Sequence, residues 1–189
     1  MFEQKIEAFT TNEGGADLRR HPRRAVFKSA LLYPVIKEAS LSITNVSTQG
    51  LSGRSALSLG LRDQVHISFN ATDFLTAEVR WTNGSQCGLL MEERLLWLGG
   101  HETFMDQLAP DDAPRETRIS VDMPATIVTS APVMVGTIRN LSVQGMMIET
   151  AGLREGTRLL AKSRGRNVRM GRVQWSSGGM VGVFFESGV

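Results

Sequence analysis

The chain has 189 residues, of which 41% are hydrophobic and 21% are charged, and its formal net charge is +2. This length and composition fit one or two small soluble globular domains, and no apolar run approaches the ~18–20 residues of a membrane-spanning helix. The first residues lack the apolar core of a signal peptide. Cys87, the one cysteine, cannot form an internal disulfide, so we expect a cytoplasmic location.

In chain order, residues 1–17 show little apolar periodicity and predict a flexible or helical arm. Short strand-like segments then follow one another, with alternating residues in several of them and an Asn-Gly hairpin turn at 83–84. The predicted strands of the first part are 25–27, 31–36, 41–43, 51–55, 65–69, 77–81 and 88–91. Those of the second part are 125–128, 133–138, 145–148, 158–161, 168–175 and 181–185.

The two series of strands carry the same six-residue pattern, Asn45-Val-Ser-Thr-Gln-Gly50 and Asn140-Leu-Ser-Val-Gln-Gly145. An arginine precedes each pattern by 22 positions: Arg23 before Asn45 (45 − 23) and Arg118 before Asn140 (140 − 118). The strand pairs that close each series, 79–91 and 173–185, also match at a shift of 94 (173 − 79). One structural unit has therefore been used twice.

Strands spaced by about 8–12 residues, with turns between them, predict an all-β protein of two small antiparallel β-barrels in tandem. Segments 92–98 and 101–108 are predicted to be helical, and 109–114, with two prolines, is a linker. The predicted organisation is an arm at 1–17, a first domain at 18–95, a helix and linker at 96–113, and a second domain at 114–189.

The sequence carries none of the common catalytic motifs: no P-loop, no dinucleotide-binding Gly-x-Gly-x-x-Gly and no Gly-x-Ser-x-Gly elbow. His21, His66 and His101 are scattered and, with a single cysteine, give no zinc spacing, so we expect no metal site. Cys87 lies in a predicted strand, where a buried hydrophobic role is expected. We therefore expect a protein that is not an enzyme.

Arginines cluster just before the first predicted strand, at positions 19, 20, 23 and 24. A guanidinium group matches phosphate oxygens or the Hoogsteen edge of guanine, and it stacks on purines. Asn45 can bind a base edge, Ser47 can donate and accept, and Gly50 permits close backbone approach or positive φ. Taken alone, Asn-x-Ser-x-x-Gly is also typical of a capped β-turn. The arginine pair at a fixed distance favours a ligand with phosphate and guanine groups.

These residues resemble the PilZ domain, the bacterial receptor module for cyclic di-GMP, whose pattern is Arg-x-x-x-Arg, about twenty residues, then Asp/Asn-x-Ser-x-x-Gly. Arg19 and Arg23, with Asn45, Ser47 and Gly50, match it. Arg20 with Arg24 is a competing register, and Arg19 with Arg23 is preferred because Arg23 keeps the 22-residue distance. The resemblance covers residues 18–95 and 114–189, and Trp81 and Gly88 fit the closing hairpin of the family.

The second copy departs from the pattern, since Pro114 occupies the position of the first arginine and Arg115 lies one position late. Arg118, Asn140, Ser142 and Gly145 are retained. Loss of one charged hydrogen-bond partner costs about 1.5–3 kcal/mol, so we interpret this copy as a degenerate site that binds weakly or not at all. Alternatively, Arg115 turns inward and compensates.

The resemblance implies a cytoplasmic cyclic di-GMP receptor without further cofactors, whose arm wraps the nucleotide and whose changed surface is read by a protein partner. Arg19, Arg20 and Arg23 would hold phosphates and guanine edges, and Asn45, Ser47 and Gly50 would fix one guanine. Arg24 is a possible secondary contact. Trp81 could border the site, although a core role is favoured. The alternatives are a scaffold that binds no nucleotide and a nucleic-acid binder, the latter disfavoured because the arm lacks interleaved aromatic residues.

Overall fold

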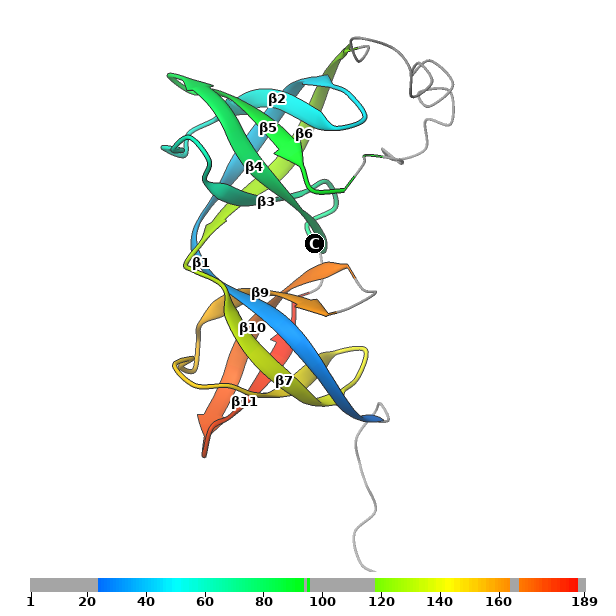
Figure 1. The fold of residues 1–189 in the computed structure, drawn as a ribbon, viewed down its shortest axis with the longest axis vertical. Coiled ribbons are helices and arrows are strands. Elements are labelled where there is room, and N and C mark those ends of the chain that lie inside the picture. Colours follow the sequence, from blue (N-terminus) through cyan, green and yellow to red (C-terminus); the bar gives the residue numbers. More distant parts are fainter. Residues whose placement is uncertain (1–23, 94, 96–117, 164–166, 187–189) are drawn as a thin grey trace, which may run out of the picture.

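The computed structural model describes residues 24–93, 95, 118–163 and 167–186, and every regular element in them is a β-strand (Figure 1). The strands join into one 11-stranded antiparallel sheet, which confirms the predicted all-β class. Of the predicted helix at 92–98, Glu92 and Glu93 form a bend. The arm at 1–17, the segment 101–108 and the linker lie outside the described residues. In the described part of the chain, no helix has the length and apolar character to span a membrane.

The first part of the chain forms β1 (Arg24–Val46), β2 (Gly50–Ser55), β3 (Gln64–Ser68), β4 (Asp73–Asn83) and β5 (Gln86–Met91). The second part forms β6 (Ile119–Ser130), β7 (Met134–Leu141), β8 (Gly145–Glu149), β9 (Arg158–Ser163), β10 (Val168–Ser177) and β11 (Met180–Phe185).

Strand β1 fuses three predicted short strands into one strand of 23 residues. Up to Pro34 it pairs with β7 and β9, and from Val35 onward it pairs with β6 and later β2. Pro34 therefore lies where β1 changes partners. A proline has no N–H to donate, and at this changeover it interrupts neither ladder. Its carbonyl still accepts a hydrogen bond of 2.8 Å from the Ala131 N–H.

The hydrogen-bonded strands close into two circuits that share β1. The first circuit begins with residues 35–46 of β1 and continues through β2, β5, β4, β3 and β6. It closes because β6 pairs with β1. The second circuit begins with residues 24–34 of β1 and continues through β7, β8, β11, β10 and β9. It closes because β9 pairs with β1. In Figure 1 the two circuits lie one above the other and β1 runs through both.

The pairing crosses the two sequence repeats. Residues 24–34 belong to the first copy but pair with β7 and β9 of the second, whereas β6 belongs to the second copy but pairs with β1 and β3 of the first. The two copies have thus exchanged their first strands. The exchange is symmetrical in register, because Arg24↔Leu141 corresponds to Ile119↔Val46 at a shift of 95 (119 − 24 and 141 − 46).

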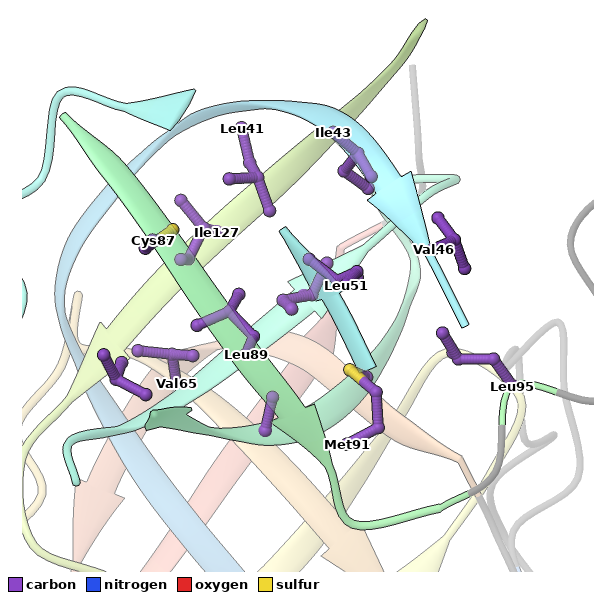
Figure 2. Packing of buried hydrophobic residues seen from close by; sticks show 13 residues of the cluster. Leu41, Ile43, Val46, Leu51, Val65, Cys87, Leu89, Met91, Leu95 and Ile127 are labelled. Atoms are coloured by element: carbon purple, nitrogen blue, oxygen red, sulfur yellow. The ribbon is translucent and has the colours of Figure 1, made fainter. Parts of the chain in front are cut away.

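Each circuit encloses its own apolar core. Figure 2 shows the first, in which Leu41, Leu51, Leu89 and Ile127 point toward one another and Leu95 packs beside Val46 and Met91. The alternating burial of strands such as β2 and β4 produces this inward face. The second core contains Ala30, Leu32, Ile138, Met146, Leu153, Leu159 and Phe185 among others. Because of the strand exchange, Ile127 of β6 belongs to the first core, and Ala30 and Leu32 of β1 belong to the second.

A third cluster joins the circuits and consists of Tyr33, Phe74, Val128, Leu160, Val168 and Met170. His66 is fully buried beside it, with its ring centroid 4.6 Å from that of Tyr33. Thr76 Oγ1 lies 3.4 Å from its Nδ1 and Ser130 Oγ lies 3.5 Å from its Nε2. Burial, with a smaller effect of the Lys162 charge, lowers the pKa of His66 to about 4. The imidazole is therefore neutral at this junction.

Candidate functional site

The two Asn-x-Ser-x-x-Gly segments form the same turn. The Ser47 N–H donates to the Gly50 carbonyl at 2.8 Å, and the Ser47 hydroxyl lies 3.3 Å from the same oxygen. In the second copy, the Ser142 N–H donates to the Gly145 carbonyl at 2.8 Å and the hydroxyl lies 3.2 Å away. Each serine therefore stabilises its own turn.

The glycine of each turn is required by close packing of two strands. A Cβ on Gly50 would lie 2.5 Å from the Leu89 carbonyl oxygen, and one on Gly145 would lie 2.2 Å from the Val183 carbonyl oxygen. Of the two roles expected for Gly50, close backbone approach is the one that the structure shows, because neither glycine has a positive φ. These glycines allow β2 and β8 to run against β5 and β11.

A groove of about 210 Å³ lies over the first turn. Asn45, Ser47 and Gly50 line it from the turn, Trp81 from β4, and Arg118 from the residue before β6. Arg118 is exposed, so its guanidinium can reach a ligand in the groove. The sequence predicts Arg118 as part of the second site, but the strand exchange brings it to the turn of the first copy.

Trp81 forms one wall of this groove and is 43% exposed, so the core role favoured from the sequence is wrong. Its ring covers Gly88, where a Cβ would lie 2.0 Å from the indole Nε1. Trp175 and Gly182 repeat the arrangement, with a distance of 2.1 Å. Each glycine thus lets an indole lie flat on the hairpin and expose its other face, a surface suited to stacking on a base.

The two asparagines differ in their hydrogen bonds. Asn45 Nδ2 lies 3.3 Å from both Thr44 Oγ1 and Ser52 Oγ, and Asn45 Oδ1 accepts from the Ser120 hydroxyl at 3.4 Å. Asn140 Oδ1 is buried and has no hydrogen-bond partner among the described residues. The position that corresponds to Ser120 is Ala25, which pairs in register with Asn140 and has no hydroxyl to donate. A buried unpaired carbonyl oxygen is costly, and it offers an acceptor to a ligand or to an incoming side chain.

The remaining predicted site residues separate into two groups. Arg19, Arg20, Arg23 and Arg115 lie outside the described residues. Arg24 is described in its backbone, which pairs with Leu141, next to Asn140 and Ser142 of the second turn. The structure therefore brings Arg118 together with Asn45, and the start of β1 together with Asn140. It does not bring Arg24 to Asn45, because they lie near opposite ends of β1 (Figure 1).

A second and larger groove, of about 520 Å³, adjoins the second turn and has no sequence prediction attached to it. Leu141 and Met146, which flank that turn, line it together with core residues of the second circuit, and Lys162 and Arg169 contribute cationic groups. The Arg169 guanidinium lies 4.4 Å from the centroid of Phe185, and its Nη1 donates to the Val143 carbonyl at 3.3 Å. Little in the sequence indicated this groove, because single cationic residues on strands, such as Lys162 and Arg169, usually face solvent.

Cys87 is 2% exposed, as its predicted strand position suggests, and burial raises the pKa of its thiol. A protonated, buried thiol is a poor nucleophile. Within residues 24–93, 95, 118–163 and 167–186, no three His, Cys, Asp or Glu side chains gather as they would around a metal ion.

Comparison with known proteins identifies no relative, since no family model, curated protein or solved structure matches this chain.

Proposed function

We propose that the chain is a tandem PilZ-type receptor for cyclic di-GMP, in which the two closed circuits are the two small β-barrels. One observation carries the proposal: an arginine and the Asn, Ser and Gly of a repeated turn line one groove, since Arg118, the residue before β6, lines it together with Asn45, Ser47 and Gly50. The same arrangement of strand and turn recurs at Asn140.

The chemistry of the groove suits this ligand. A guanidinium group binds phosphate oxygens or the guanine Hoogsteen edge in a bidentate manner, and the exposed face of Trp81 offers a stacking surface beside it. The turn at Gly50 lines the same groove, where a planar base could approach its backbone. The resemblance assigns the additional cations that two phosphates require to Arg19, Arg20 and Arg23, which precede the start of β1 and not its other end at Asn45.

The proposed output is a change of surface. On this proposal the arm wraps the nucleotide, at a cost of part of the binding energy, and the complex presents a changed surface. A protein partner that binds only the changed surface would then couple nucleotide level to its own activity. The receptor acts as an adaptor in this scheme and carries out no chemistry on the nucleotide.

Calorimetric titration of the full chain with cyclic di-GMP, with GTP as the control ligand, tests the proposal. We expect low-micromolar or tighter binding of cyclic di-GMP, little heat from GTP, and a loss of about tenfold or more on Arg19→Ala. If the register is Arg20 with Arg24, Arg20→Ala weakens binding and Arg19→Ala does not. Absence of heat and of a thermal shift with cyclic di-GMP overturns the receptor function.

The second candidate is a scaffold that acts through protein contacts alone. It is favoured by a specific observation: the serines and glycines of both turns already have structural roles, in the turn hydrogen bonds and in strand packing. On this hypothesis the repeated motif maintains the fold, and the titration shows no binding while partners are still captured.

A further inference from the structure

The groove of about 520 Å³ opens into the interior of the second circuit. All six strands of that circuit contribute to its lining, with Ala30 from β1, Ile138 from β7, Met146 from β8, Ala161 from β9, Arg169 from β10 and Phe185 from β11. All of these side chains except the arginine belong to the core of the second circuit. The groove is therefore an open end of the barrel interior, a place where small-molecule sites are common.

A difference between the two copies explains why there is room at this end. In the first circuit, Ile67 of β3 pairs in register with Leu75 of β4. The pair at the same place in the second circuit, at a shift of 94 (161 − 67 and 169 − 75), is Ala161 with Arg169. Ile67 is fully buried and Leu75 packs against the first core. The second circuit thus has a smaller side chain and a cation where the first has two aliphatic side chains.

Leu95 covers the corresponding end of the first core, where it packs beside Val46 and Met91 (Figure 2). The counterpart of Val46 is Leu141 (141 − 46 = 95) and that of Met91 is Phe185 (185 − 91 = 94). Within the ranges that the structure describes, these two counterparts border the open volume of the groove instead. The first core is closed at this end, and the second presents apolar side chains to a ligand.

Arg169 is the cation that the groove offers to a ligand. Among the described residues it takes part in no ion pair. Its guanidinium lies over the Phe185 ring, 4.4 Å from the centroid, and its Nη1 donates to the Val143 carbonyl at 3.3 Å. A guanidinium has five N–H donors, so Arg169 is held in place by one of them and keeps others for an anion.

The two other charged groups among the described lining residues already have partners. Lys162 Nζ lies 3.3 Å from Glu92 Oε2, and Asp73 Oδ2 accepts from Asn70 Nδ2 at 3.3 Å. The charges of Lys162 and Asp73 also cancel each other within the groove. The remaining charge is that of Arg169, so the groove attracts an anion.

The apolar part of the lining suits an aliphatic chain better than a base. Phe185, the one aromatic residue among the described lining residues, is buried and has the Arg169 guanidinium over its ring. It offers no stacking surface such as the exposed indole of Trp81 in the groove over Asn45. An aliphatic chain needs no such surface, because each methylene that it buries increases affinity about fourfold.

We infer that the second circuit binds a carboxylate with an aliphatic chain in this groove. The chain lies on the core side chains, and the carboxylate accepts two parallel hydrogen bonds from the guanidinium of Arg169. The site is separate from the groove over Asn45, which lies in the first circuit. It is therefore independent of the proposed binding of cyclic di-GMP there.

Calorimetric titration of the full chain with octanoate, decanoate and dodecanoate tests the site, at neutral pH and below the micellar concentration of each. We expect one carboxylate per chain, with an affinity that rises about 15-fold for the two methylenes between octanoate and decanoate. Decan-1-ol has the same chain without the charge and should bind at least tenfold more weakly than decanoate. Absence of decanoate binding, or equal binding of the alcohol, overturns the inference.

A matched pair of arginine variants tests the role of the cation. Arg169→Gln should weaken decanoate binding tenfold or more and change decan-1-ol binding less than about twofold. Arg172→Gln is the control, because Arg172 lies on the same strand, pairs with Glu186 at 3.1 Å and is not among the residues that line the groove. It should change decanoate binding less than about twofold. Equal losses in the two variants would show attraction by overall charge and overturn the site.

Ala161→Ile tests the room in the groove, since it installs the residue that the first circuit has at the same place. The variant should fold, because Ile67 fits the equivalent core position, and it should bind decanoate at least tenfold more weakly. In NMR spectra of the unmodified chain, decanoate should shift the methyl resonance of Met146, assigned through Met146→Leu, and leave that of Met91 in the first core unchanged. Unchanged decanoate affinity in both Arg169→Gln and Ala161→Ile places the ligand elsewhere and overturns the inference.

Discussion

Asn45 accepts a hydrogen bond of 3.4 Å from Ser120, a residue 75 positions later in the chain. The bond joins the repeated asparagine of one copy to the first strand of the other, and it exists because β6 lies beside β1 in the first circuit. At the equivalent place in the second circuit, Ala25 stands opposite Asn140 and has no hydroxyl. The two turns are alike in backbone, and among the described residues only Asn45 has a partner for its side-chain oxygen.

Ala25→Ser should supply the missing donor to Asn140. A hydroxyl that satisfies a buried acceptor contributes about 0.5–1.5 kcal/mol, so we expect the free energy of unfolding to rise by that amount in urea denaturation. Ser120→Ala is the matched control and should lower it by a similar amount. An unchanged stability in Ala25→Ser would show that Asn140 Oδ1 already has a partner outside the described residues.

The glycines of the turn and of the hairpin should respond differently to alanine. In Gly145→Ala the new Cβ meets a backbone carbonyl oxygen of Val183 at 2.2 Å, so strands must separate, at a cost of about 1–3 kcal/mol. In Gly88→Ala it meets the Trp81 ring, which is 43% exposed and can swing away. We expect that variant to lose less than about 1 kcal/mol and to shift its tryptophan emission. Equal losses in stability would contradict this distinction.

His66 should make the protein less stable in acid. Its pKa is about 4 when folded, against 6.5 for the free side chain, because burial disfavours the imidazolium. Between pH 6.5 and 4, His66 is therefore protonated in the unfolded chain and neutral in the folded chain. Stability is fully present above pH 6.5 and falls by up to about 3 kcal/mol as the pH drops to 4.

The His66→Gln variant isolates this effect, since glutamine keeps a polar side chain at the junction and does not titrate. Urea denaturation at several pH values should show a shallower loss of stability for the variant between pH 6.5 and 4. If stability falls equally with pH in the two proteins, His66 takes up its proton over the same pH range in the folded and the unfolded chain, which contradicts the prediction.

Much of the fold could be predicted from the sequence, because strand pattern and turn chemistry are local. The alternation along β3 and β4, the Asn83-Gly84 turn and the doubled Asn-x-Ser-x-x-Gly segment all led to the right kind of element. The merger of three short strands into β1 was missed, because polar residues such as Ser29, Lys37 and Ser40 separate the apolar segments. Pro34, inside one of the predicted strands, lies at the change of partner strands.

The exchange of strands could not be predicted, for a physical reason. Residues 24–34 could pair with their own copy or with β7, because the two copies offer closely similar partners in the same register. The spacing of 22 residues from Arg23 to Asn45 fits either arrangement. Only the conformation at residues 34–38 and 131–133 separates the two arrangements, as in domain swapping. The position of Arg118 beside Asn45 depends on this feature, so the sequence could name candidate site residues but could not group them.

The shared strand should make the two circuits unfold together. Because β1 contributes to both circuits and the cluster around Leu160 joins them, loss of one circuit removes a strand from the other. Trp81 on β4 and Trp175 on β10 report on the two circuits separately. The double variant Trp97→Phe with Trp175→Phe keeps only Trp81, and the double variant Trp97→Phe with Trp81→Phe keeps only Trp175. We expect the fluorescence of both variants to show unfolding at the same urea concentration.

A core truncation in one circuit gives the stricter test of this coupling. Val79 is fully buried in the first circuit, and Val79→Ala should destabilise by about 1–3 kcal/mol. Since the circuits share β1, the midpoint reported by Trp175 in the second circuit should fall as far as that reported by Trp81. Leu160→Ala at the junction should lower both midpoints by more, at a cost of about 2–5 kcal/mol. A Val79→Ala protein in which Trp175 keeps its midpoint would show that the second circuit folds by itself, which the pairing of residues 24–34 with β7 and β9 argues against.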